Sequence, residues 1–142
     1  MFETPVVVSR LAQAAQINPR LLEAIRARRA ENPGIARSNI LGWHSDTEML
    51  QWGGSAAADL LQHMVRLCDL QTSDTGAIEG APPRFVWGFE MWANVSPPNA
   101  SNQSHAHPGA IWSAVYYVDD GYAGSKERTL GGNWFFTIRV FP

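Results

Sequence analysis

The chain has 142 residues, of which 45% are hydrophobic and 17% charged, and its formal net charge is −2. This length favours one domain (residues 1–142) with a core of its own, the composition excludes a disordered chain, and the absence of a basic run argues against a nucleic-acid partner. The chain has a single cysteine, Cys68, and no apolar run near the roughly 20 residues that span a bilayer. The first ten residues, MFETPVVVSR, do not form a secretory signal. We therefore expect a cytoplasmic protein without a membrane partner.

The first half of the chain is predicted to hold a short strand and two helices. Residues 4–8 are mostly β-branched, which suits an edge strand. Asn18 followed by Pro19 predicts a helix start, with Asn18 as the cap, and the helix is expected to end before residues 32–34. A second helix is predicted over residues 55–70. Its expected buried side consists of Leu60, Leu61, Met64, Val65, Leu67 and Cys68.

The second half changes from a helical to a strand-like pattern. Residues 71–83 read as a loop, and residues 85–92 alternate in the manner of a half-buried strand. Residues 111–118 predict a further strand, followed by a turn at 119–121. Helices followed by strands predict an α+β protein in which the strands form a sandwich or a barrel.

Two histidines, His105 and His107, stand one residue apart before the last predicted strand. Residues two apart in an extended segment share a face, so both imidazoles can reach one point in space. Such a pair suits Fe, Zn, Cu or Ni. Short histidine pairs also arise in loops or as hydrogen-bonded core residues, so the spacing alone leaves a metal site and a structural role open.

Four polar side chains are candidates to face the histidine pair. Asn94 and Asn102 line the approach to it and could orient a ligand through their amides, although asparagine is equally typical of turns. Tyr117 shares the face of the histidines if the strand is continuous. A break at residues 108–109 would leave that place to Tyr116.

The remaining histidines and the cysteine are expected to be structural. His63 falls within the second predicted helix, and His44 lies in a glycine-bearing turn. Cys68 is on an apolar helical face, where it packs rather than reacts. Core or rim packing is also expected for the six tryptophans: Trp43, Trp52, Trp87, Trp92, Trp112 and Trp134.

A set of short motifs occurs in order along the chain, at residues 2–6, 38–39, 42–45, 92–95 and 102–118. Together these segments resemble a bacterial family of 2-oxoglutarate/Fe(II)-dependent oxygenases. The resemblance implies a double-stranded β-helix, or jelly roll, with flanking N-terminal helices. It implies Fe(II) bound by His105 and His107, and 2-oxoglutarate decarboxylated as O₂ is activated to hydroxylate a substrate C–H bond. We expect Asn94, Asn102, Tyr116 and Tyr117 to contact the cofactor.

The chain departs from the family pattern after the last predicted strand. The family takes a third ligand, usually a histidine, and a carboxylate-binding arginine from downstream strands. No histidine follows His107, and Arg128 and Arg139 do not lie in a matching motif. We therefore expect an incomplete barrel. The reading frame permits a family-like ending if one base is lost near Gly131-Gly132, which predicts a frameshifted, truncated member.

Two alternatives from other classes remain open on the sequence alone. One is a jelly-roll binding or scaffold protein without turnover, which the missing third ligand favours. The other is a cupin-like metalloprotein in which His44 completes a three-histidine site. The substrate and the oligomeric state do not follow from the sequence.

Overall fold

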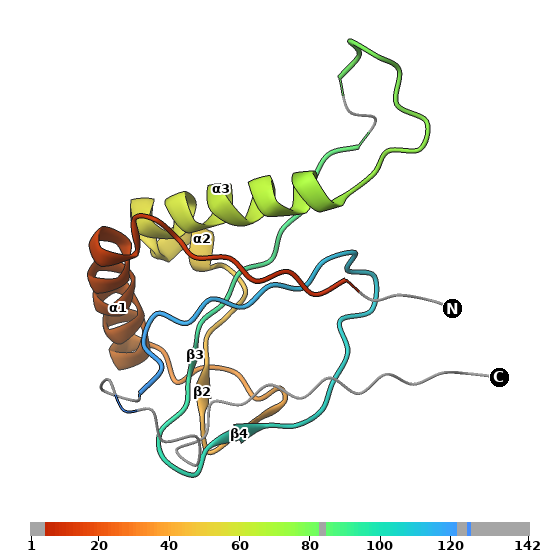
Figure 1. Ribbon diagram of the computed structural model, residues 1–142. Helices are drawn as coiled ribbons and strands as arrows, with labels where there is room; N and C mark the ends of the chain where they lie inside the picture. Colours follow the sequence, from red (N-terminus) through yellow and green to blue (C-terminus); the bar gives the residue numbers. More distant parts are fainter. Residues whose placement is uncertain (1–4, 83–84, 122–124, 126–142) are drawn as a thin grey trace, which may run out of the picture.

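The computed structural model describes residues 5–82, 85–121 and 125 (Figure 1). Three helices and four two-residue strands make up the regular structure of these residues. They are α1 (Ala14–Glu31), β1 (Asn39–Ile40), β2 (Trp43–His44), α2 (Met49–Trp52), α3 (Gly54–Gln71), β3 (Asn94–Val95) and β4 (Ser101–Asn102).

The core lies where α1 meets α3. On α1, Leu21 is fully buried, and Ile25 lies one turn further along the same face. On α3, the small side chains of Ala56 and Ala57 are also buried, which lets the two helices approach closely. The complete set of buried apolar residues in the described chain is Leu11, Ile17, Leu21, Ile25, Trp43, Met49, Ala56, Ala57, Leu60 and Ala93.

The predicted start of the first helix is wrong. α1 begins at Ala14 and contains Pro19, so Asn18 is not its cap. Ile17 is buried, and the apolar stripe therefore extends a turn earlier than Leu21. The Asn18 side chain instead donates to the Val118 carbonyl oxygen at 3.0 Å, which fastens a distant segment to α1.

The second predicted helix is confirmed as α3, whereas the short α2 before it was not predicted. α2 ends at Gly53, where an added Cβ would lie 2.6 Å from the Met49 carbonyl oxygen. Of the residues expected on the buried side of α3, only Leu60 is buried, and the others are half-buried. The burial is shifted toward the N-terminal end of α3, because α1 crosses it there through Ala56 and Ala57.

Two small antiparallel sheets join segments that are far apart in the sequence. β1 pairs with β4, with Asn39 opposite Asn102. β2 pairs with β3, with His44 opposite Asn94. The mixed helical and sheet character that the sequence predicts is thereby confirmed.

The longer predicted strands are not formed. Residues 5–8, 85–92 and 111–118 make no strand, apart from a single bridge residue at Met91, and no closed barrel exists among the described residues. Val8, Val86 and Ile111 are 90%, 94% and 76% exposed. A β-branched or alternating pattern indicates side chains that suit a sheet, but a strand also needs a neighbouring backbone to accept and donate its hydrogen bonds.

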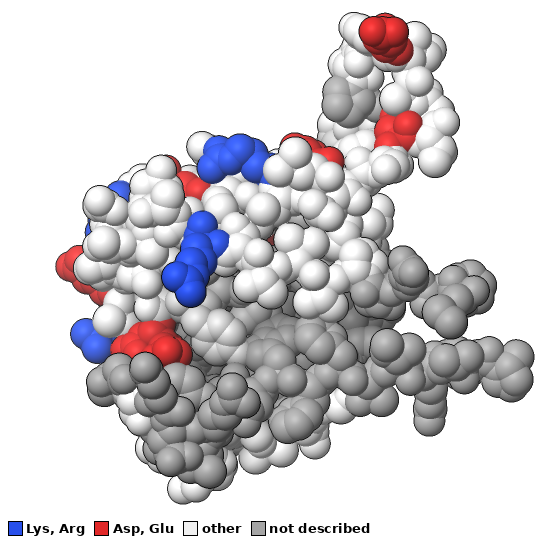
Figure 2. Space-filling view, viewed as in Figure 1, with Lys and Arg blue, Asp and Glu red and all other residues white. Residues whose placement is uncertain are grey.

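The charged side chains visible in one view gather over the helices and on the loop after α3 (Figure 2). No helix in the described part of the chain combines the length and the apolar character that a membrane-spanning segment requires. The expectations for Arg128, Arg139 and Gly131-Gly132 fall outside the described residues.

Candidate metal centre

The structure brings the two neighbouring histidines together. The ring centroids of His105 and His107 lie 4.8 Å apart and the rings are nearly perpendicular, at 82°. Both side chains are exposed, and the segment that carries them is irregular rather than a strand. Two imidazoles are therefore presented side by side at the surface, where a metal ion could reach both.

The backbone sets the protonation pattern of His105. Its Nδ1 atom lies 2.8 Å from the Gln103 carbonyl oxygen. A carbonyl oxygen only accepts hydrogen bonds, so Nδ1 carries the proton of the neutral ring. The lone pair is consequently on Nε2, which is the arrangement that a metal-binding histidine needs.

The β1–β4 sheet anchors the start of the histidine segment. Gln103, the residue that orients His105, donates its backbone N–H to the Ser38 carbonyl oxygen at 2.7 Å. Asn39 of β1 donates from its side chain to the Gly42 carbonyl oxygen at 2.8 Å, which shapes the turn that leads into β2. The position of His105 thus depends on a strand pair more than 60 residues apart in sequence.

A row of aromatic rings connects the histidine pair to the interior. The His44 ring, which is buried, stacks on Trp92 at 5.6 Å between centroids and 12° between planes. Trp92 in turn contacts the His107 ring at 5.6 Å and 40°. The row runs from the buried β2 side chain, through a half-buried indole, to the exposed His107.

The backbone around Trp92 is fixed by a buried serine. Ser45 is fully buried and exchanges two contacts with Ala93: its N–H donates to the Ala93 carbonyl oxygen, and its Oγ accepts from the Ala93 N–H, both at 3.0 Å. The Ser45 hydroxyl donates its own proton to the Asp46 carbonyl oxygen at 2.6 Å. On the other side of Trp92, Met91 accepts a hydrogen bond from the N–H of Met49 at 3.1 Å.

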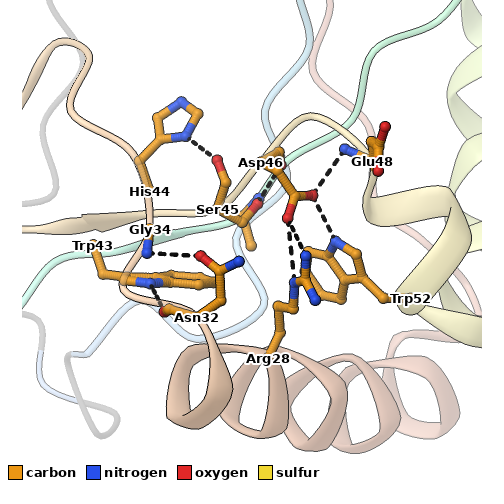
Figure 3. A network of polar contacts seen from close by, with 10 residues as sticks. Arg28, Asn32, Gly34, Trp43, His44, Ser45, Asp46, Glu48 and Trp52 are labelled. Carbon is orange, nitrogen blue, oxygen red and sulfur yellow. Dashed lines mark hydrogen bonds and ion pairs between the residues drawn. The ribbon is translucent and has the colours of Figure 1, made fainter.

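An ionic clamp holds this region to α1 (Figure 3). The Asp46 carboxylate accepts hydrogen bonds from the Arg28 guanidinium, from the Trp52 indole N–H at 2.9 Å and from the Glu48 N–H at 3.0 Å. The bond from Arg28, followed by that from Trp52, lowers the pKa of Asp46 from 3.8 to about 2. Asp46 therefore stays ionised at neutral pH and joins α1, β2 and α2.

The loop after α1 packs tightly against β2. Gly34 has a φ of +80°, and a Cβ there would lie 2.6 Å from the His44 carbonyl oxygen and 2.7 Å from the Trp43 ring. The same His44 oxygen accepts the Ile35 N–H at 2.8 Å, while the Trp43 indole donates to the Asn32 carbonyl oxygen at 2.9 Å. Glycine is required here both by the backbone conformation and by the space available.

The four predicted cofactor contacts fall into two groups. Asn94 on β3 and Asn102 on β4 are exposed; β3 pairs with β2, and β4 directly precedes the histidine segment in the chain. Tyr116 is half-buried and donates its hydroxyl to Asn18 on α1 at 2.6 Å. Gly109 has a φ of +85° in the turn after His107, so the continuous strand assumed for Tyr117 is broken there.

Tyr117 lines a separate cavity of about 500 Å³ beside the first part of α1. The cavity has both apolar and acidic walls. Its lining residues are Asn18, Pro19, Leu22, Tyr117, Val118, Asp119 and Asp120.

The predicted three-histidine site is not formed. His44 stacks on Trp92 and places its Nδ1 on the Ser45 carbonyl oxygen. Among residues 5–82, 85–121 and 125, no three His, Cys, Asp or Glu side chains are grouped so that they could hold a metal ion. His63, expected to be structural, lies 3.4 Å from the Ser9 hydroxyl through its Nε2.

Two residues, Trp92 and Asp46, make contacts that the sequence did not predict. Trp92 was expected only to pack, and Asp46 was not singled out. A signal for Asp46 does exist, because an aspartate shortly before an apolar run favours a turn in which its carboxylate accepts a backbone N–H two residues on. No comparable local signal marks Trp92, since its contacts come from residues distant in sequence.

Residues 90–137 match the model of a protein family described as "Putative 2OG-Fe(II) oxygenase". The resemblance to this oxygenase family is confirmed. The match to the 2OG-Fe(II) oxygenases covers about a third of the chain and includes Trp92 and both histidines of the pair. No curated protein and no solved structure gives a significant match.

Proposed function

We propose that the chain is a non-haem Fe(II)/2-oxoglutarate-dependent oxygenase that uses His105 and His107 as its metal ligands. One observation carries this proposal: the matched segment contains two imidazoles whose ring centroids lie 4.8 Å apart. In one of them, His105, the proton is on Nδ1, which donates to a backbone carbonyl oxygen, so the Nε2 lone pair is available to a metal. The substrate would be hydroxylated at a C–H bond.

The donor atoms suit the metal in chemical type. Neutral imidazoles bind Fe(II), and non-haem oxygenases combine two of them with a carboxylate and leave positions open for the cosubstrate. His105 would bind through Nε2, because its Nδ1 proton is committed to Gln103. When bound, Fe(II) with 2-oxoglutarate would supply the activation of O₂. Asn94 and Asn102, both exposed, remain our candidates to orient the cosubstrate.

Among the described residues, no third His, Cys, Asp or Glu side chain is grouped with the pair. A centre with two protein ligands would bind iron more weakly than a complete facial triad, with water in the remaining positions. The jelly roll that the family implies is likewise a proposal. The two antiparallel strand pairs support it, because a jelly roll is built from antiparallel strands.

Anaerobic titration of the whole chain with Fe(II), with and without 2-oxoglutarate, tests this function. We expect Fe(II) to bind and a metal-to-ligand charge-transfer absorption to appear only when both are present. His105→Ala and His107→Ala should each abolish the band. His63→Ala is the matched control, because this histidine lies on α3 and contacts Ser9 instead.

The fold of each variant is checked by circular dichroism before the titration. A folded wild-type chain that binds no Fe(II) would refute the proposal and favour the scaffold alternative. A charge-transfer band that survives both alanine substitutions would place the metal elsewhere.

A further inference from the structure

The two imidazoles of the candidate centre are oriented by different means. His105 is held by a hydrogen bond from its Nδ1 to the Gln103 carbonyl oxygen, the usual way in which a protein orients a metal-binding histidine. Among the described residues, the His107 ring has no hydrogen-bond partner, and its aromatic neighbours are Trp92 and His105. Something other than a hydrogen bond must therefore set the plane of His107.

We propose that Trp92 is a positioning residue that fixes the His107 imidazole by ring contact, with His44 holding the indole in place. The inference rests on the proposed function, since it assigns Trp92 a role at that metal centre. Centroid distances of 5.6 Å from Trp92 to His44 and to His107 are within the range of favourable aromatic pairs.

Trp92 can position the His107 ring because several independent contacts fix Trp92 itself. The residues before and after it, Met91 and Ala93, are both hydrogen-bonded to the segment between β2 and α2. His44 is buried and nearly parallel to the indole, so the ring is supported from the core. Because the exposed His107 imidazole packs against this indole, it has little rotational freedom even without metal, and less conformational entropy is lost when a metal ion binds.

The test compares two substitutions of one residue. Trp92→Phe keeps an aromatic face, whereas Trp92→Leu keeps apolar bulk without one. We expect the leucine variant to bind Co(II), used as a stable probe for Fe(II), about tenfold more weakly, and the phenylalanine variant to bind within about threefold of wild type. Trp87→Leu is the matched control, because that indole contacts Asp69 at the far end of α3.

A second readout needs no metal. In the metal-free wild-type chain, the ring protons of His107 should be shifted by the ring current of Trp92, whereas those of His63 should not. The shift should disappear in Trp92→Leu. Unshifted His107 protons in the wild type would overturn the proposal even if the leucine variant fails to fold.

The outcomes separate the two proposals. If wild type binds Co(II) and folded Trp92→Leu binds it equally well, Trp92 only stabilises the fold and the inference is wrong. If wild type binds no Co(II), the proposed function fails, and the role of Trp92 at a metal centre fails with it. The shift of His107 would then report ring packing alone.

Discussion

Replacing Asp46 by asparagine should remove a pH-dependent part of the stability. Asparagine resembles the protonated acid, so it keeps the shape but loses the charge that Arg28 binds. The pKa of Asp46 is about 2 in the folded chain against an ordinary value of 3.8. A shift of this size corresponds to about 2 kcal/mol, and water around this part-exposed pair reduces it to about 1 kcal/mol.

The sign follows from the lowered pKa. The contribution is complete above the unfolded pKa near 3.8 and is lost as the pH falls toward 2. Thermal unfolding followed by circular dichroism should therefore show Asp46→Asn melting about 2–4 °C below wild type near neutral pH. The two melting temperatures should converge as the pH approaches 2.

A neighbouring carboxylate provides the control. Glu48 is exposed and takes part in the clamp only through its backbone N–H, so Glu48→Gln should leave that pH-dependent difference unchanged. A wild-type advantage over Asp46→Asn that stays constant down to pH 2, or that is missing at neutral pH, would refute the assignment of the clamp to an ionised Asp46.

Three further substitutions test the packing around the site. Leu21→Ala, at the centre of the helical core, should lower the free energy of unfolding by about 2–5 kcal/mol in urea titrations. Gly34→Ala should lower the melting temperature because the added Cβ would meet the His44 carbonyl oxygen on β2. Gly88→Ala should leave it unchanged because open space surrounds that residue. Equal melting temperatures for the two variants would contradict this prediction. Asn18→Ala removes the hydrogen bonds that this side chain makes with Val118 and Tyr116 and should cost about 2 kcal/mol, with faster amide exchange in that segment; unchanged exchange would argue against the anchor.

The two long helices, α1 and α3, could be predicted because the periodic apolar pattern that indicates a helix lies within neighbouring residues. An apolar period over residues 55–70 was enough to find α3. The start of α1 was missed because the Asn18-Pro19 pair is a common helix start, and the burial of Ile17 depends on the packing of the helices rather than on the neighbouring sequence. The four short strands could not be predicted, since two residues carry no period.

The candidate site was predictable only in part. The spacing of His105 and His107 indicated that their rings could meet, and the structure brings them together in an irregular segment rather than on the expected extended strand. The contacts of Trp92 connect residues 15 or 48 positions apart, a relation that one sequence does not reveal. Tyr117 was placed beside the histidines by strand parity, and the turn at Gly109 invalidates that argument.

The pairing of β2 with β3 determines when the site can assemble. The two strands are separated by about 50 residues that contain α2 and α3, and closing a loop of this length costs conformational entropy before any strand contact forms. Because helices form from local contacts, we expect α1 and α3 to associate early and the β2–β3 ladder to close late in folding. Trp92 reaches His44 only at that late step. The imidazole pair would therefore acquire its final arrangement after most of the hydrophobic burial is complete. In stopped-flow folding, the part of the tryptophan emission change that Trp92→Leu removes should lag behind helix formation.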